Sequence, residues 1–356
     1  MGALRTIFAL AVAIAHAGGI FGYVPMNGDT AVQAFYVVSG FYMALVFTEK
    51  YSALATPALT FWLNRYLRLA PAYILLAGIS LWVVNRGLLD NLDLRTQLLV
   101  TLSQLSMLGQ DVFAFIAVDL TSGNLFFVKN FHMLESTSAA PLLSFMPIPQ
   151  GWTLGLEAAF YLLVPLLVRC RTTTLSLLAA AILALHVAGM YLLGLRGDPW
   201  TYRFFPFELA VFLFGMLAYR AMRAGWVSRH RAIIFAVLVA VAIVYHYMPG
   251  GGAEKRWAYI LAFSLSVPTI FQYTKASAVD RWIGDLSYPL YIVHLLAFSV
   301  VRNFIGDHHW LVPVELAGAI GCALLISLLI ERPIDRLRDR LSRSSRPPPA
   351  EAMARP

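Results

Sequence analysis

The sequence predicts an all-α protein that crosses a membrane about ten times. Of its 356 residues, 59% are hydrophobic and only 13% are charged, whereas soluble domains carry about 25% charged residues. Apolar runs long enough to cross a bilayer recur along the chain, and basic residues gather in alternate loops between them. This pattern excludes a soluble enzyme. The net charge of +8 does not indicate nucleic-acid binding, because the basic residues lie in short loops.

The expected spans share a length close to the roughly 20 helical residues that cross a hydrocarbon core. They are residues 5–22, 31–49, 67–85, 151–168, 174–194, 204–221, 231–248, 257–273, 285–303 and 311–330. The first run is not followed by a small-residue cleavage site and polar sequence, so we expect a retained helix rather than a signal peptide.

A further apolar stretch, residues 97–118, is ambiguous. If ten spans cross and the N-terminus is inside, the inside segments hold 19 of the 27 Lys and Arg residues. An eleventh crossing at 97–118 would reverse every later loop. We therefore expect residues 86–150 to form a long external excursion, partly re-entrant, that lines the site. Both termini would then be cytoplasmic, with residues 1–341 as the membrane domain and residues 342–356 as a disordered tail.

The first helix carries the strongest candidate for chemistry. His16 follows Arg5 by eleven residues, which is roughly 16 Å along a helix. That places an imidazole near the middle of the bilayer, where an ionisable side chain is costly and suggests a functional site. The alternative is a polar residue that is simply satisfied by a neighbouring helix.

Other ionisable residues occupy or flank the spans. Glu157 lies about 9 Å into the fourth span and is either functional or paired for packing. Arg65 and Arg68 share one helix face at the start of the third span. They suit phosphates or a carboxylate, although a positive-inside flank explains them equally. His294 is expected at mid-membrane depth, and Glu208 either pairs with Arg203 or forms a polar rim for a substrate.

The residues alone leave two classes of function open. One is a membrane transferase that takes a phosphorylated donor from the cytosol. The other is a proton-coupled transporter or flippase, because buried His and Glu also form proton relays. The two cysteines, Cys170 and Cys322, indicate neither a disulfide framework nor a metal motif, and no metal site is expected.

Six short motifs, taken in order, resemble those of the membrane acyltransferase family 3. They are the Arg5 to His16 spacing, residues 35–41 (Phe-Tyr-Val-Val-Ser-Gly-Phe), residues 65–71 (Arg-Tyr-Leu-Arg-Leu-Ala-Pro), the block from Trp152 to Pro165, residues 286–294 (Leu-Ser-Tyr-Pro-Leu-Tyr-Ile-Val-His), and residues 331–333 (Glu-Arg-Pro). The series covers nearly the whole chain. The family's ten-helix plan agrees with the ten spans inferred above from the distribution of Lys and Arg residues. The chain departs from the family pattern at two positions. Gln33 stands near the place where the family usually has Asp, and Thr153 stands where it usually has Ser. The chain resembles the stand-alone type, without a fused esterase-like domain.

The resemblance implies an O-acyltransferase of the bacterial inner membrane. It moves an acyl group, most often acetyl, from cytosolic acyl-coenzyme A to a hydroxyl of a surface or secreted carbohydrate, free or lipid-linked. Arg5, Arg65 and Arg68 are expected to hold the donor, and His16 and Glu157 to perform the chemistry. The acceptor is expected to contact Trp152, Glu208 and His294. Direct transfer and a covalent acyl-His16 intermediate both stay open. Membrane lipid is the other expected partner, nucleic acid is not, and the alternative function is transport of a glycan or an acylated compound.

Overall fold

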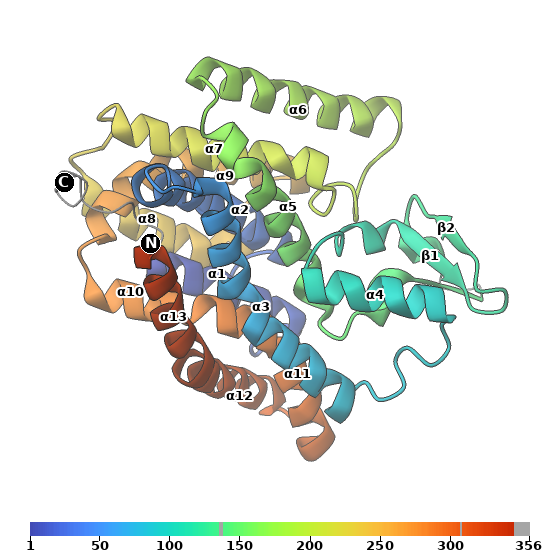
Figure 1. Ribbon diagram of the computed structural model, residues 1–356. Helices are drawn as coiled ribbons and strands as arrows, with labels where there is room; N and C mark the ends of the chain where they lie inside the picture. The colour runs from blue at the N-terminus through green and yellow to red at the C-terminus, as the bar shows by residue number, and fades with distance from the viewer. Residues whose placement is uncertain (135–137, 307, 345–356) are drawn as a thin grey trace, which may run out of the picture.

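Long helices packed side by side make up most of the protein, and a small lobe with three short strands projects from one end (Figure 1). The computed structural model describes residues 1–134, 138–306 and 308–344. The helices are α1 (Gly2–His16), α2 (Gly28–Val46), α3 (Pro57–Val83), α4 (Leu94–Ser106), α5 (Trp152–Leu167), α6 (Thr172–Leu192), α7 (Phe205–Arg223), α8 (Arg231–Val244), α9 (Gly252–Thr274), α10 (Ala278–Asp285), α11 (Ser287–Ile305), α12 (Leu311–Ile326) and α13 (Arg332–Ser344).

Six helical stretches are long and apolar enough to cross a membrane. They are Gly28–Tyr51, Pro57–Val83, Thr172–Leu192, Phe205–Arg223, Ala278–Ile305 and Leu311–Arg338. Two shorter apolar helices, Gly2–His16 and Arg231–Tyr247, accompany them. The prediction of a mainly helical membrane protein is thus confirmed. The expected count of about ten adds α1, α5, α8 and α9 to these six, and those four helices are shorter or more polar.

The third predicted span begins earlier than the sequence suggested. Helix α3 starts at Pro57, which occupies its first turn, where a missing backbone N–H costs nothing. Arg65 and Arg68 therefore lie inside this helix rather than at its start. At the other end of the chain, helix α13 continues to Ser344, and the rest of the predicted tail, residues 345–356, lies outside the described residues.

The ambiguous stretch 97–118 does not form one helix. Helix α4 begins after Asp93, whose side chain accepts hydrogen bonds from the first-turn amides, and ends at Met107, which has a left-handed backbone. A three-stranded antiparallel sheet follows in the order β2 (Leu125–Phe127), β1 (Ile116–Asp119), β3 (Ala139–Pro141). Val118 pairs with Leu125 on one side and with Ala140 on the other. The lobe has a small apolar core of its own, and residues 97–118 contain no single helix of membrane-crossing length.

Helix α1 is fixed at its first turn against α10. The Asp280 carboxylate accepts hydrogen bonds from the amino group of Met1 and the amide of Gly2, both at 2.7 Å, and from the amide of Ala3 at 2.9 Å. The backbones of α1 and α10 approach closely here, because a Cβ on Gly2 would lie 1.7 Å from the Asp280 carbonyl oxygen. A carboxylate at a helix N-terminus also suits the helix dipole. This anchor sets the register of every side chain along α1, including Arg5 and His16.

Candidate active site

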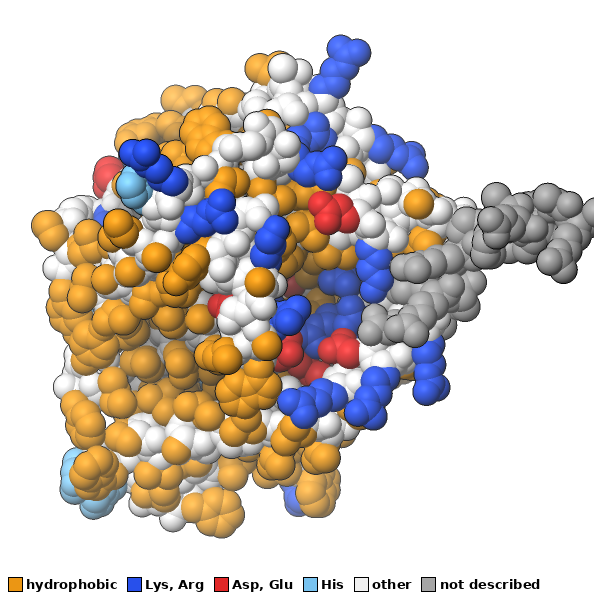
Figure 2. Space-filling view, turned by 90° about the vertical axis from the view of Figure 1, so that its left-hand side faces the viewer, with side chains coloured by type: hydrophobic (Ala, Val, Ile, Leu, Met, Phe, Trp, Pro, Cys, Tyr) orange, Lys and Arg blue, Asp and Glu red, His pale blue; other side chains and the backbone are white. Residues whose placement is uncertain are grey.

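A deep cavity opens on the face that carries the start of α1 and helix α13. It measures about 230 Å³ and is lined by side chains of α1, α2, α3, α5 and α11. We call it the arginine cavity, because Arg5, Arg65 and Arg68 line it together. Figure 2 shows this face hollowed, with Lys and Arg side chains around and inside the hollow. Its lining runs along α2 from Val32 to Val46, which is roughly 21 Å of helix.

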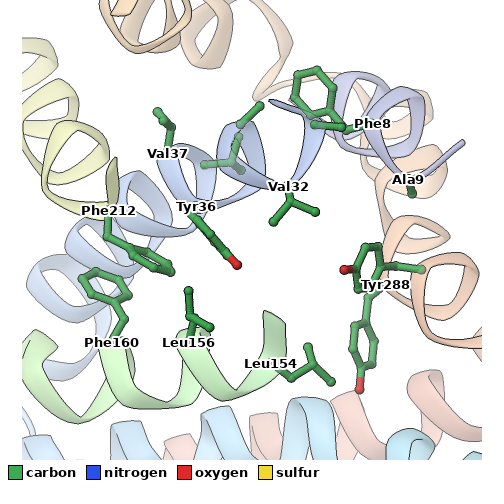
Figure 3. Packing of buried hydrophobic residues seen from close by; sticks show 14 of the residues in the cluster. Phe8, Ala9, Val32, Tyr36, Val37, Leu154, Leu156, Phe160, Phe212 and Tyr288 are labelled. Carbon is green, nitrogen blue, oxygen red and sulfur yellow. The ribbon is translucent and has the colours of Figure 1, made fainter. Parts of the chain in front are cut away.

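Apolar and aromatic side chains form most of the cavity wall below the arginines. Val32 and Tyr36 of α2 face Leu154 of α5 and Tyr288 of α11 across an open space (Figure 3). Tyr36 is held by a stack of rings, with its centroid 4.6 Å from that of Phe212. The cavity therefore combines a cationic mouth with a largely apolar interior.

The three arginines differ in their partners. Arg68 pairs with Glu331 at 3.2 Å and with Asp335 at 3.7 Å. Within the described part of the chain, Arg5 and Arg65 have no ion-pair partner, and the buried Nε of Arg65 has no hydrogen-bond partner. An unpaired guanidinium in a cavity is prepared to bind an anion, since a buried charge without a partner is costly.

Glu157 also lines the arginine cavity. Tyr161, one helical turn further along α5, donates a hydrogen bond of 2.7 Å to its carboxylate. The sequence prediction grouped Glu157 with His16. The structure instead places Glu157 with the arginines, because His16 does not line this cavity.

His16 lines a second cavity, of about 210 Å³, at the opposite end of the bundle. We call it the histidine cavity. Its walls come from the last turn of α3, the segment 147–150 and the second half of α11, and its polar lining includes Asn85, Gln150, Ser299 and Arg302. The linings of the two cavities share no residue among those that the structure describes, so His16 and the arginines lie in separate cavities.

The two predicted histidines meet in a layer of side chains between these cavities. His16 Nδ1 lies 2.8 Å from His294 Nε2, and the rings are nearly parallel. His294 is fully buried, and its Nδ1 lies 2.7 Å from the carbonyl oxygen of Tyr291. His16 and His294 are 278 residues apart in the sequence, so only the packing of α1 against α11 brings them together.

Neighbouring polar groups complete the layer. Gln150 Nε2 donates to the carbonyl oxygen of Ile292 at 2.8 Å, and Thr153 Oγ1 donates to the Gln150 carbonyl at 3.0 Å. Gln150 lines the histidine cavity, whereas Thr153 and Tyr291 line the arginine cavity. Polar side chains of this layer thus face one cavity or the other, and the layer holds the imidazole pair.

The remaining predicted residues lie apart from both linings. Trp152 packs under Arg203, whose guanidinium carbon is 4.2 Å from the ring centroid. Arg203 pairs with Asp198 at 2.6 Å, so the suggested pair with Glu208 is not formed. Glu208 is fully buried and accepts a hydrogen bond of 2.9 Å from Gln33. Gln33 thus joins α2 to α7 at the position where the sequence departs from the family pattern.

Comparison with known protein families decides the class of this site. A profile described as an acyltransferase domain, Acyl_transf_3, matches residues 1–332. The chain belongs to the acyltransferase 3 family. It is therefore a multi-pass membrane acyltransferase. Comparisons with curated proteins and with solved structures returned no match.

Sequence reasoning missed several residues that this acyltransferase uses to build the site. Ser39, Tyr288 and Tyr291 line the arginine cavity, and Glu331 holds Arg68. All four residues fall inside the family motifs at 35–41, 286–294 and 331–333. Membership of these motifs was the sequence signal that could have identified them. Gln150 stands just before the block that begins at Trp152, and nothing in its sequence setting marked it.

Within residues 1–134, 138–306 and 308–344 there is no group of three His, Cys, Asp or Glu side chains placed to hold a metal ion.

Proposed function

We propose that this acyltransferase moves an acetyl group from cytosolic acetyl-coenzyme A to a hydroxyl of a surface or secreted carbohydrate, in the inner membrane of a bacterium. The observation that carries the proposal is the pair of cavities at opposite ends of the bundle, which lie on either side of the His16–His294 layer. Such an arrangement allows donor and acceptor to reach one reaction centre from two sides of a membrane.

The arginine cavity is the proposed donor site. Acyl-coenzyme A carries several phosphate charges and a long, thin arm that ends in the thioester. Arg5 and Arg65 offer guanidinium groups that have no carboxylate partner among the described residues, which suits phosphate. The largely apolar interior between α2, α5 and α11 suits the arm, and Glu157 with Tyr161 lies along its course. The donor is made in the cytosol, so this mouth and both termini are assigned to the cytoplasmic side, in agreement with the distribution of basic residues.

The histidine cavity is the proposed acceptor site. Its polar lining can hold hydroxyl groups, and His16 faces it as the one imidazole among the lining residues described. A neutral His16 removes the proton from the acceptor hydroxyl as the oxygen attacks the thioester carbonyl. The carbon–sulfur bond then breaks, the proton passes to the leaving sulfur, and an ester and free coenzyme A result. General-base assistance of this kind contributes about 10²–10⁴-fold.

The proposal gives other roles to the three side chains that were expected to contact the acceptor. Trp152 is buried under Arg203 and is assigned to packing rather than to the acceptor. Glu208 has no access to either cavity and is assigned to packing between α2 and α7. His294 touches His16 rather than open space, so its role runs through His16.

The excursion after α3 fits a re-entrant segment. On α4 the polar side chains of Thr96, Ser103 and Gln104 are buried, whereas Leu98 and Leu102 are 53% and 63% exposed. This polarity is inverted relative to a helix in water, and it suits a helix whose outer face meets lipid. The end of α4 also reaches Tyr66, whose hydroxyl donates to the Leu105 carbonyl at 2.8 Å, well inside α3. Quenching of a fluorophore at position 102 by brominated lipid tails tests this, and quenching by an aqueous quencher alone would refute it.

The test of function is transfer of radiolabelled acetyl from acetyl-coenzyme A into glycan by membranes that contain the protein. His16→Ala should abolish transfer, whereas His309→Ala, which removes an exposed histidine, should leave it unchanged. Release of coenzyme A should depend on the acceptor. Equal transfer by the parent and His16→Ala would refute the role of His16. Movement of unmodified glycan across the membrane without coenzyme A release would favour the transporter alternative, which predicts no covalent change in its cargo.

A further inference from the structure

The hydrogen bonds of the histidine pair determine where their protons lie. A carbonyl oxygen can only accept, so the bond between His294 Nδ1 and the Tyr291 carbonyl requires a proton on Nδ1. His294 is fully buried, and no carboxylate is hydrogen bonded to it within the described residues. A charged imidazole there would lack compensation, so the ring is neutral and its Nε2 carries a lone pair.

That lone pair fixes the tautomer of His16. Because His294 Nε2 accepts, His16 Nδ1 must donate across the 2.8 Å contact. A neutral His16 then has its only proton on Nδ1, and its Nε2 is an unprotonated base. Among the described residues, Nε2 of His16 has no hydrogen-bond partner, and the ring lines the histidine cavity. The basic nitrogen is therefore left for a group that occupies the cavity.

We propose that His294 is a positioning residue that holds His16 in the tautomer with a basic Nε2 directed to the acceptor. The chain of groups is Tyr291 carbonyl, His294 and His16, and the chain is carried entirely by α11 and the last turn of α1. The inference rests on the proposed function for its catalytic meaning, but the protonation pattern follows from the geometry alone.

The histidine pair also provides a path for the acceptor's hydroxyl proton during acyl transfer. The acceptor hydroxyl gives its proton to His16 Nε2 as the new carbon–oxygen bond forms, and the imidazole becomes doubly protonated. Its Nδ1–H bond to His294 persists and is strengthened by the positive charge. The proton on Nε2 then goes to the coenzyme A sulfur as the carbon–sulfur bond breaks, which restores the starting tautomer. No proton has to leave through His294.

A purely structural role for His294 makes a different prediction. If the ring served only to fill space between α1 and α11, any side chain of similar size and polarity would serve. Glutamine and asparagine separate the two cases. His294→Gln places its amide near the position of Nε2, where the oxygen can accept from His16. His294→Asn places its amide near Nδ1, too far away to reach His16.

The first experiment reads the tautomer without relying on activity. Protein labelled with ¹⁵N-histidine is studied by NMR in nanodiscs, and the His16 signals are identified by their loss in His16→Gln. We expect a proton on Nδ1 and none on Nε2 of His16 in the parent and in His294→Gln. A proton on Nε2 in the parent overturns the inference.

The second experiment measures acetyl transfer by the same proteins. We expect His294→Asn to lose about 100-fold in kcat, with KM for acetyl-coenzyme A unchanged, and His294→Gln to stay within about 10-fold of the parent. Equal losses in the two variants, with an unchanged His16 tautomer, overturn the positioning role. If the parent transfers no acetyl yet shows the expected tautomer, the proposed function fails while the protonation pattern stands.

Discussion

Replacing Arg68 by alanine should destabilise the protein more than it weakens donor binding. The Arg68 guanidinium lies 3.2 Å from Glu331, whose side chain is only 4% exposed. Removing one partner of a buried ion pair leaves the other charge without compensation, which costs about 3–5 kcal/mol. The pair also ties α3 to the segment that leads into α13, so its loss should loosen the mouth of the arginine cavity.

The structure supplies both a rescue and a matched control. Arg68→Gln combined with Glu331→Gln removes both charges and should recover at least half of the lost stability, which a double-mutant cycle measures directly. Arg65→Ala removes a neighbouring guanidinium that has no carboxylate partner among the described residues. Its stability should change by less than about 1 kcal/mol. Its KM for acetyl-coenzyme A should rise about 10–150-fold, because one charge-assisted hydrogen bond contributes about 1.5–3 kcal/mol.

The assay pairs reversible unfolding in detergent with donor kinetics for each variant. We expect Arg68→Ala to lower the free energy of unfolding and Arg65→Ala to raise the donor KM. This expectation would be refuted if Arg68→Ala unfolded like the parent and showed a raised KM alone. Arg68 would then be a donor ligand, as its sequence motif suggested, and its contact with Glu331 would be incidental.

Two further predictions concern packing and pH. Gly40→Ala should lower the free energy of unfolding by about 1–3 kcal/mol or more, because its Cβ would lie 2.0 Å from the Phe212 carbonyl oxygen where α2 crosses α7. Gly78→Ala is the control, since nothing lies within 4 Å of the added Cβ. Equal yields and melting temperatures of the two variants would contradict this prediction. Burial raises the pKa of Asp111 in the lobe from 3.8 to about 6. The folded state then binds more protons than the unfolded state between these values, so stability falls as pH rises from about 4 to 6, by about 3 kcal/mol in all. Asp111→Asn should remove that dependence and be the more stable protein at pH 7; an unchanged pH profile of unfolding would show that Asp111 is not the group responsible.

Much of the fold was predictable from composition and loop charge. Each expected span overlaps a helix, because a long apolar run has no other way to satisfy its backbone in a membrane. The boundaries were less accurate. Helix α3 begins ten residues before its apolar core, at Pro57, since helix propensity and packing extend a helix beyond the part that lipid requires. The stretch 97–118 divides into α4 and β1 because Met107 ends the helix, and hydropathy averages over that break.

The sequence by itself determined the class of protein, the family motifs and the residue types that chemistry needs, because these depend on composition and local spacing. Arg5, His16, Arg65, Arg68, Glu157 and His294 could all be named from the chain. Only the tertiary structure decided which of them act together. It placed Glu157 with the arginines, tied Arg68 to Glu331, and joined His16 to His294. Contacts between helices far apart in the chain depend on how side-chain surfaces pack, and no local pattern records that.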